Sequence, residues 1–116
     1  MNKRDVMEYD VLIVGGGPSG LSAAIRIKQL AKKETKDISV CLVEKGTEVG
    51  SHILSGAVID TVALDELIPN WKEKGAPLNT KVKKDTFNLF SEKGHLTIPQ
   101  ILMPPLMSNK DNYIAS

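Results

Sequence analysis

The sequence of 116 residues has little of several features that would decide its class. Its single cysteine, Cys41, excludes an internal disulfide, a four-cysteine zinc site and an iron–sulfur cluster built from this chain alone. The 15 Lys and Arg nearly balance the 14 Asp and Glu, so the net charge gives no sign of nucleic-acid binding. No apolar run approaches the ~18 residues of a membrane span. The start, MNKRDVMEYD, has neither an apolar signal core nor a presequence pattern, and we expect one domain in a cytoplasmic, reducing compartment.

What the sequence does have is a glycine-rich turn between an expected strand and an expected helix. Residues 10–14 form a short apolar run, typical of a strand buried on both faces of a parallel sheet. From residue 19 to about residue 33, apolar positions recur at helical spacing, and Pro18 suits the first turn of that helix. Residues 38–43 are typical of a second buried strand. This order predicts a βαβ unit over residues 10–44.

The glycines of the turn fit the pattern G-x-G-x-x-G. Gly15 allows the tight turn, Gly17 lets the backbone approach a pyrophosphate, and Gly20 lets the helix pack close to the strand. Backbone N–H groups at the start of a helix, at the positive end of its dipole, bind a pyrophosphate without a lysine. The predicted cofactor contacts of this turn are Gly15, Gly16, Gly17, Pro18, Ser19 and Gly20.

An acidic residue at the end of the second strand completes the predicted dinucleotide site. Glu44 follows Gly20 by 24 residues, and a carboxylate there can accept both ribose hydroxyls of an adenosine. The same charge would repel a 2′-phosphate, which disfavours NADP. Lys45 joins Glu44 among the predicted cofactor contacts. Spacing alone does not choose between FAD and NAD.

Four stretches of the chain resemble the amino end of the electron transfer flavoprotein–ubiquinone oxidoreductases. They read DVLIVGGGPSGLSAA, VCLVEK, GSHILSGAVID and WKEKGAPLNT, and the last is far more specific than the glycine motif. The resemblance runs along nearly the whole chain. It implies an α/β fold, with the Rossmann-like βαβ start of an FAD/NAD(P)-binding domain. It also implies an FAD enzyme that takes electrons from electron transfer flavoprotein, through a four-iron four-sulfur cluster, and passes them to ubiquinone.

The chain departs from that family in its length and its cysteine content. The family's enzymes are several times longer and hold their cluster with four cysteines near the far end, whereas this sequence has one cysteine. We therefore expect residues 1–116 to be an amino-terminal part of an FAD-binding domain, without the cluster, without metal ligands or catalytic residues, and inactive alone. By resemblance, the enzyme lies peripherally on the cytoplasmic side of a bacterial inner membrane, or on the mitochondrial inner membrane in a eukaryote.

Residues 45–70 are expected to form a flavin-side loop and a helix. By resemblance, the loop brings the backbone of Ser55, Gly56 and Ala57 near the flavin ring; the alternative is an ordinary loop that enters the next helix. His52 has no identifiable partner carboxylate and is not expected to be catalytic. A short helix over residues 61–68, capped by Asp60, is expected to be scaffold.

Residues 71–116 are expected to form a connecting segment. Trp71 should pack over the helix before it, and residues 79–84 should be a turn-rich connection. The stretch TFNLF is a strand or an edge segment, and His95 is expected to be a surface residue in a polar turn. Cys41 is expected to be an inert small hydrophobe. The last residues, NYIAS, are expected to begin another strand.

One stretch near the end is unusual because residues 94–109 contain no Asp, Glu, Lys or Arg. Within it, IPQILMPPLM places large apolar side chains among three prolines, which forbid a regular helix. One interpretation is that this stretch packs against strands outside this chain. The other is that the region from Phe87 to Met107 forms an exposed apolar patch that docks into one membrane leaflet.

Two other functions stay open from the sequence. One is a noncatalytic adenine-dinucleotide-binding module that works beside separate chains. The other is part of a different FAD-dependent oxidoreductase, such as a geranylgeranyl-reductase-like protein, which should lack the stretch WKEKGAPLNT.

Overall fold

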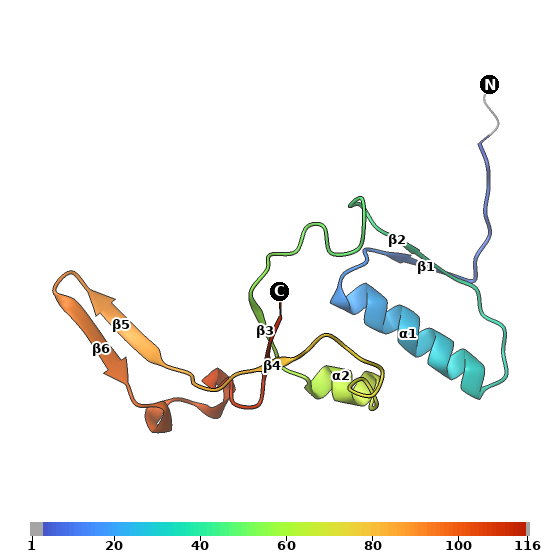
Figure 1. Ribbon diagram of the computed structural model, residues 1–116. Coiled ribbons are helices and arrows are strands. Elements are labelled where there is room, and N and C mark those ends of the chain that lie inside the picture. Colours follow the sequence, from blue (N-terminus) through green and yellow to red (C-terminus); the bar gives the residue numbers. More distant parts are fainter. Residues whose placement is uncertain (1–3, 116) are drawn as a thin grey trace. The chain divides into compact units, whose positions relative to one another are not determined.

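The computed structural model describes residues 4–115. The chain divides into two compact units, Met1–Ile53 and Leu54–Ser116. Figure 1 shows their helices and strands, and each unit is described separately below.

The first unit is a strand–helix–strand arrangement. Strand β1 (Val11–Val14) is followed by helix α1 (Pro18–Lys33) and strand β2 (Val40–Val43). The two strands pair in parallel, from Val11 opposite Val40 to Val14 opposite Val43. Helix α1 lies along this pair (Figure 1). The predicted order of elements is confirmed, and the strands begin one or two residues later than expected.

The prediction that these strands are buried on both faces is wrong for this chain. Leu12 and Val14 are 62% and 82% exposed, whereas Ile13 between them is half-buried. Successive side chains of a strand point to opposite faces, and α1 packs against only one of them. Ala31 of the helix is buried. The other face of the pair is uncovered within this unit.

A hydrogen-bonded clasp aligns the starts of the two strands. The carboxylate of Asp10 accepts hydrogen bonds from the hydroxyl of Ser39 at 2.6 Å and from its backbone N–H at 2.8 Å. The backbone N–H of Asp10 donates in return to the Ser39 hydroxyl at 2.9 Å. The hydrogen bond from the Ser39 hydroxyl, followed by that from the Ser39 backbone N–H, holds the pKa of Asp10 below its ordinary value.

The second unit contains a small antiparallel sheet. Its order is β3 (Ala57–Ile59), β7 (Tyr113–Ala115) and β4 (Thr80–Lys81). The strand expected at the end of the chain is confirmed as β7. Strand β4 lies inside residues 79–84, so the prediction of a turn-rich connection there is wrong in part. Thr80 and Lys81 become a strand because they pair with Ile114 and Tyr113, far away in the sequence.

Trp71 is the best-buried side chain of the second unit, at 3% exposure. Its indole N–H donates to the Asp65 carboxylate of α2 (Val62–Leu67) at 2.6 Å. Its ring stands edge-on to Tyr113 of β7, with ring centres 5.6 Å apart. The expected packing of Trp71 over this helix is confirmed. Asp60 accepts a hydrogen bond from the N–H of Val62 at 3.0 Å, but the N-cap residue is Thr61, and the helix is one residue shorter at each end than predicted.

A hairpin and two short turns complete the second unit (Figure 1). Strands β5 (Phe87–Ser91) and β6 (Gly94–Ile98) pair in antiparallel fashion, so all of TFNLF except its first residue, Thr86, lies in a strand. His95 lies in β6 opposite Phe90 rather than in a turn, and it is exposed as expected. Two 3₁₀ turns follow, η1 (Gln100–Leu102) and η2 (Pro105–Met107). Within residues 4–115, no helix has the length and apolar content needed to cross a membrane.

Candidate nucleotide-binding site

The turn between β1 and α1 requires glycine at its first position. Gly15 has φ of 104°, in the left-handed region that side-chain-bearing residues rarely adopt, and its N–H donates to the carbonyl of Val43 at 2.8 Å. Gly17 then caps α1 in an extended conformation, and Pro18 opens the helix. Because Gly17 has no side chain to cap the helix, the first N–H groups of α1 are available to an anion.

Gly20 allows the close approach of helix and strand. A Cβ atom at Gly20 would collide with the carbonyl oxygen of Gly15 and would lie 3.2 Å from Cγ2 of Ile13. A side chain is therefore incompatible with this packing, which is the structural role predicted for the third glycine of the motif.

The two middle glycines have different surroundings. A Cβ at Gly16 would lie 3.1 Å from a carboxylate oxygen of Glu44 and 3.1 Å from Cγ2 of Val49. A Cβ at Gly17 would have no heavy atom within 4 Å. Gly16 is thus packed against protein, while Gly17 faces open space at the start of α1. This open space is where a phosphate group can approach the backbone.

Glu44 is fixed beside this turn by two backbone groups. One carboxylate oxygen accepts a hydrogen bond from the N–H of Gly16, and the other accepts one from the N–H of Gly46, each at 2.7 Å. The bond from Gly46, followed by that from Gly16, holds the pKa of Glu44 below its ordinary value. The carboxylate is therefore ionised at neutral pH. Each oxygen keeps a further lone pair, so the group can still accept two hydroxyl donors.

Gly46 belongs to this arrangement, although the sequence pattern did not indicate it. A Cβ there would collide with the hydroxyl oxygen of Ser51 and would lie 3.4 Å from the other Glu44 oxygen. The only available signal was its position two residues after the acid, and the dinucleotide pattern contains no glycine at that position.

The other predicted contacts lie on exposed backbone. Pro18, Ser19 and Lys45 are exposed in the first unit. Ser55, Gly56 and Ala57 belong to the second unit, where Gly56 has φ of 82° and Ala57 opens β3. Their contact with a flavin stays a prediction. Among residues 4–115, no three His, Cys, Asp or Glu side chains gather as a metal site requires.

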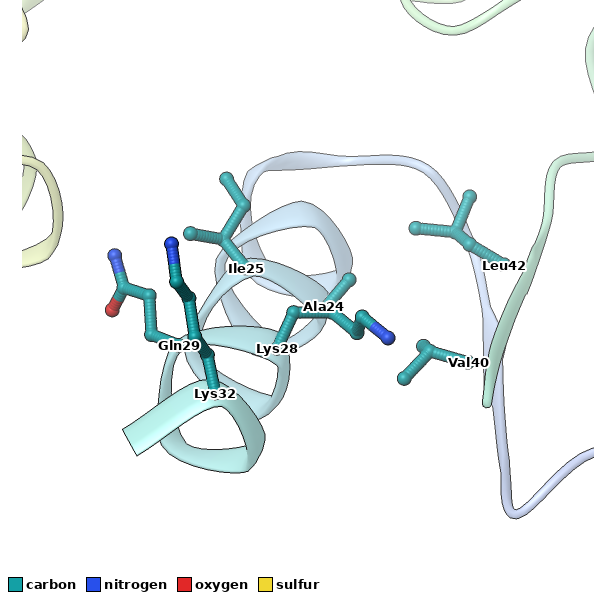
Figure 2. Close-up of a pocket in the computed structure, with 7 residues that line it drawn as sticks. All are labelled: Ala24, Ile25, Lys28, Gln29, Lys32, Val40 and Leu42. Atoms are coloured by element: carbon teal, nitrogen blue, oxygen red, sulfur yellow. The ribbon is translucent and has the colours of Figure 1, made fainter. Parts of the chain in front are cut away.

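A separate groove of about 580 Å³ lies between α1 and β2 (Figure 2). Val40 and Leu42 of β2 project toward the helix there, and Ala24 and Ile25 of α1 form part of the opposite wall. None of the residues that line it belongs to the glycine turn. The groove is therefore part of the partly covered helix–strand interface and not of the candidate site.

The fold and this turn define a class of nucleotide-binding protein. Residues 13–79 match the family of NAD(P)-binding Rossmann-like domains, and the chain belongs to this family. The predicted α/β fold class is thereby confirmed.

Comparison with curated proteins gives more specific relatives. The chain is 62% identical over 113 residues to the mitochondrial electron transfer flavoprotein-ubiquinone oxidoreductase of Dictyostelium discoideum, covering 97% of this chain and 18% of that protein. It is 54% identical to the probable electron transfer flavoprotein-ubiquinone oxidoreductase of Acinetobacter baylyi, covering 98% and 20%, and 55% identical to the human mitochondrial protein, covering 97% and 18%. The predicted resemblance is confirmed. The chain spans about a fifth of the length of these relatives.

Gly20→Ala tests the packing of the turn. Although alanine favours helices by ~1 kcal/mol over glycine, we expect the variant to lose about 1–3 kcal/mol of unfolding free energy through overpacking against the Gly15 carbonyl. Urea unfolding followed by circular dichroism measures the change. Ser22→Ala, at an exposed position of the same helix, is the control and should be neutral or slightly stabilising. A Gly20→Ala variant as stable as the wild type would contradict the close packing.

Glu44 should titrate below the ordinary range of a glutamate. Because its folded-state pKa is lowered, its hydrogen bonds contribute fully above the unfolded-state pKa, and this contribution is lost as the pH falls through the folded-state pKa. Carboxyl-carbon NMR across an acid titration measures the value. Glu44→Gln is the control, since this component of the pH dependence of stability should be absent from it. Titration of Glu44 at or above its ordinary pKa would show that the two N–H donors do not hold the charge in solution.

Proposed function

We propose that this chain is the amino-terminal, FAD-binding part of an oxidoreductase that passes electrons from electron transfer flavoprotein to ubiquinone. One observation carries the nucleotide part of the proposal. The ionised carboxylate of Glu44 is held beside the open, uncapped start of α1 at Gly17. The names of relatives that match nearly the whole chain support the particular enzyme.

The two parts of the site suit the two ends of an adenosine diphosphate group. The first N–H groups of α1, at the positive end of the helix dipole, bind the pyrophosphate. The Glu44 carboxylate accepts the two ribose hydroxyls with its remaining lone pairs, and its charge disfavours a 2′-phosphate. FAD is chosen over NAD by the family resemblance. Lys45 and the backbone of Ser55, Gly56 and Ala57 are further proposed contacts.

Bound flavin would supply the electron-accepting chemistry, and this chain would supply its adenosine and pyrophosphate contacts. The four-iron four-sulfur cluster and the ubiquinone site belong, in this proposal, to the remaining four-fifths of the longer enzyme. Residues 1–116 alone are accordingly proposed to be inactive. Nucleic acid is not a proposed partner. The proposed location is peripheral, on the cytoplasmic side of a bacterial inner membrane or on the mitochondrial inner membrane of a eukaryote.

The proposed membrane contact is an apolar patch of the second unit. Its side chains come from the β5–β6 hairpin and from the turns η1 and η2, and all are exposed: Phe87, Leu89, Phe90, Leu96, Ile101, Leu102, Leu106 and Met107. Phe87, Leu89 and Leu96 share one face of the hairpin, and Phe90 lies on the other. Ile101 is 92% exposed and Leu106 is fully exposed, so these two side chains have almost no cover within this unit. Exposed apolar surface of this kind favours insertion into one leaflet of a membrane.

Gly17→Ala in the full-length protein tests the pyrophosphate contact. The added methyl group meets no protein atom within 4 Å, so the fold should be retained while the path of the pyrophosphate is obstructed. We expect a large loss of bound FAD, measured by absorbance after gel filtration, with unchanged circular dichroism. Ser22→Ala is the control. Full flavin content in Gly17→Ala would refute the assigned site.

Glu44→Gln and the isolated segment extend this test of FAD binding. Glu44→Gln should weaken FAD affinity by roughly 10- to 100-fold, because it removes a charge-assisted acceptor. Residues 1–116 alone should bind FAD weakly or not at all, since they hold only one end of it. Stoichiometric FAD bound to residues 1–116 alone would contradict the proposal that the rest of the enzyme supplies the other FAD contacts.

Replacement of Ile101, Leu102 and Leu106 with serine tests the membrane patch. We expect the full-length variant to lose flotation with phosphatidylcholine vesicles while it keeps its FAD. Serine at Val6, Met7 and Val62, which are also apolar and mostly exposed but lie outside the patch, is the control. Unchanged flotation of the patch variant would exclude this segment as a principal anchor, and joint loss of FAD would indicate that it packs within the protein.

A further inference from the structure

A cavity of about 310 Å³ with a mixed polar and apolar lining lies in the second unit, where the chain beyond β4 meets the ends of η1 and η2. Its polar lining consists of Lys83, Lys84, Asp85, Gln100, Ser108 and Lys110. This cavity is distinct from the glycine turn, and the proposed electron transfer assigns it no role.

The cavity is positively charged. Three exposed lysines are among its lining residues, against one acidic residue, Asp85. One oxygen of Asp85 already accepts hydrogen bonds from the backbone N–H and the side-chain amide of Asn109, at 3.0 and 3.1 Å. The nearby carboxylate of Asp111 is paired with Lys81 at 2.6 Å. Over residues 4–115, no ion pair joins Lys83, Lys84 or Lys110 to a carboxylate. The cavity therefore suits an anion.

Neutral donors complete the lining. The side-chain amide of Gln100 donates to the hydroxyl of Ser108 at 3.4 Å, and the backbone N–H of Lys110 donates to the same oxygen at 3.3 Å. The Ser108 oxygen thus accepts from two donors, which leaves its own proton to donate to a ligand oxygen. Lysine ammonium groups with a hydroxyl donor are the groups that bind a phosphate.

The same two turns carry the two most exposed apolar side chains of the patch, Ile101 and Leu106. Gln100 is the first residue of η1, and Ile101 and Leu102 follow it directly. Ser108 comes directly after η2, which carries Leu106. An anion site whose lining residues Gln100 and Ser108 lie within two residues of exposed apolar side chains in the sequence suits an amphiphile, with a charged head and an apolar tail. A free phosphate would use only the cationic half of this arrangement.

We propose that this cavity binds the phosphate headgroup of an anionic phospholipid while Ile101, Leu102 and Leu106 enter the acyl layer. The proposal rests on the membrane docking proposed above and adds a lipid preference to it. Each lysine near an anionic membrane surface contributes about fivefold to binding, so a pair contributes about 25-fold.

Flotation of the full-length protein on two kinds of vesicle tests the proposal. One kind is phosphatidylcholine alone, and the other contains phosphatidylglycerol as well. We expect the wild type to bind the second kind more tightly, and Lys83→Gln/Lys110→Gln to lose about 25-fold of that preference while its binding to phosphatidylcholine and its FAD content stay unchanged. Lys33→Gln/Lys36→Gln, with the same change of charge on exposed residues of the first unit, is the matched control and should keep the preference.

The outcomes separate this proposal from the docking on which it rests. A wild type that binds neither kind of vesicle refutes the membrane docking and, with it, the lipid site. A wild type that binds both kinds equally, or a preference lost to the same degree in both double variants, refutes the lipid site alone. If Lys83→Gln/Lys110→Gln loses FAD or its fold, the test uses the wild type in added salt. Salt should abolish its preference for phosphatidylglycerol vesicles while its binding to phosphatidylcholine persists. A preference that survives added salt would refute the lipid site.

Two other ligands would each overturn the lipid site. Binding of inorganic phosphate that the lysine variant loses, without any vesicle preference, would assign the cavity to free phosphate. Slower reduction by electron transfer flavoprotein in the lysine variant, with unchanged binding to both vesicles, would assign it to an acidic protein surface.

Discussion

The close approach of α1 to β1 at Gly20 is the constraint on which the candidate nucleotide site depends. With no Cβ between Gly20 and the carbonyl of Gly15, the helix can start directly beyond the end of the strand. The parallel register then sets Val14 opposite Val43, so the glycine turn and Glu44 lie at the same edge of the strand pair. From that position the Glu44 carboxylate reaches the N–H of Gly16 at 2.7 Å. Backbone packing therefore brings the acid to the turn.

This geometry places the positive end of the α1 dipole close to the negative Glu44 carboxylate, while the carboxylate is paired with other N–H groups. The positive end of α1 is open at Gly17, and the negative carboxylate of Glu44 is held by the N–H groups of Gly16 and Gly46. A pyrophosphate and a ribose diol need these two features in this order along the ligand. The proposed binding of these two groups therefore depends on backbone geometry plus one side chain, which explains why so few residues of the sequence specify the candidate site.

Local patterns in the sequence were sufficient for the features that depend on neighbouring residues. The glycine spacing, the helical period, the acid after the second strand and the packing of Trp71 over α2 fall in this group. The exposure of Leu12 and Val14 could not be predicted from the sequence. An apolar strand pattern shows that both faces of the strand are apolar, but it does not show which face is covered by residues of the same chain. Strand β4 was missed since its two residues pair with β7 about thirty residues later. Gly46 was missed because the dinucleotide pattern contains no glycine two residues after the acid, and its contacts with Glu44 and Ser51 appear only in the folded loop.

The exposed apolar side chains of the two units differ in the cover that they can receive. Leu12 and Val14 belong to a strand pair, whose uncovered face is the kind on which further protein packs. Ile101 and Leu106 stand on 3₁₀ turns among prolines, and the N–H groups of Leu102, Met103, Met107 and Ser108 already donate within those turns. Such a segment offers few free donors to a neighbouring strand, and its internal bonding is what insertion into hydrocarbon demands. This difference supports protein as the cover for the first unit and lipid as the cover for the turns of the second.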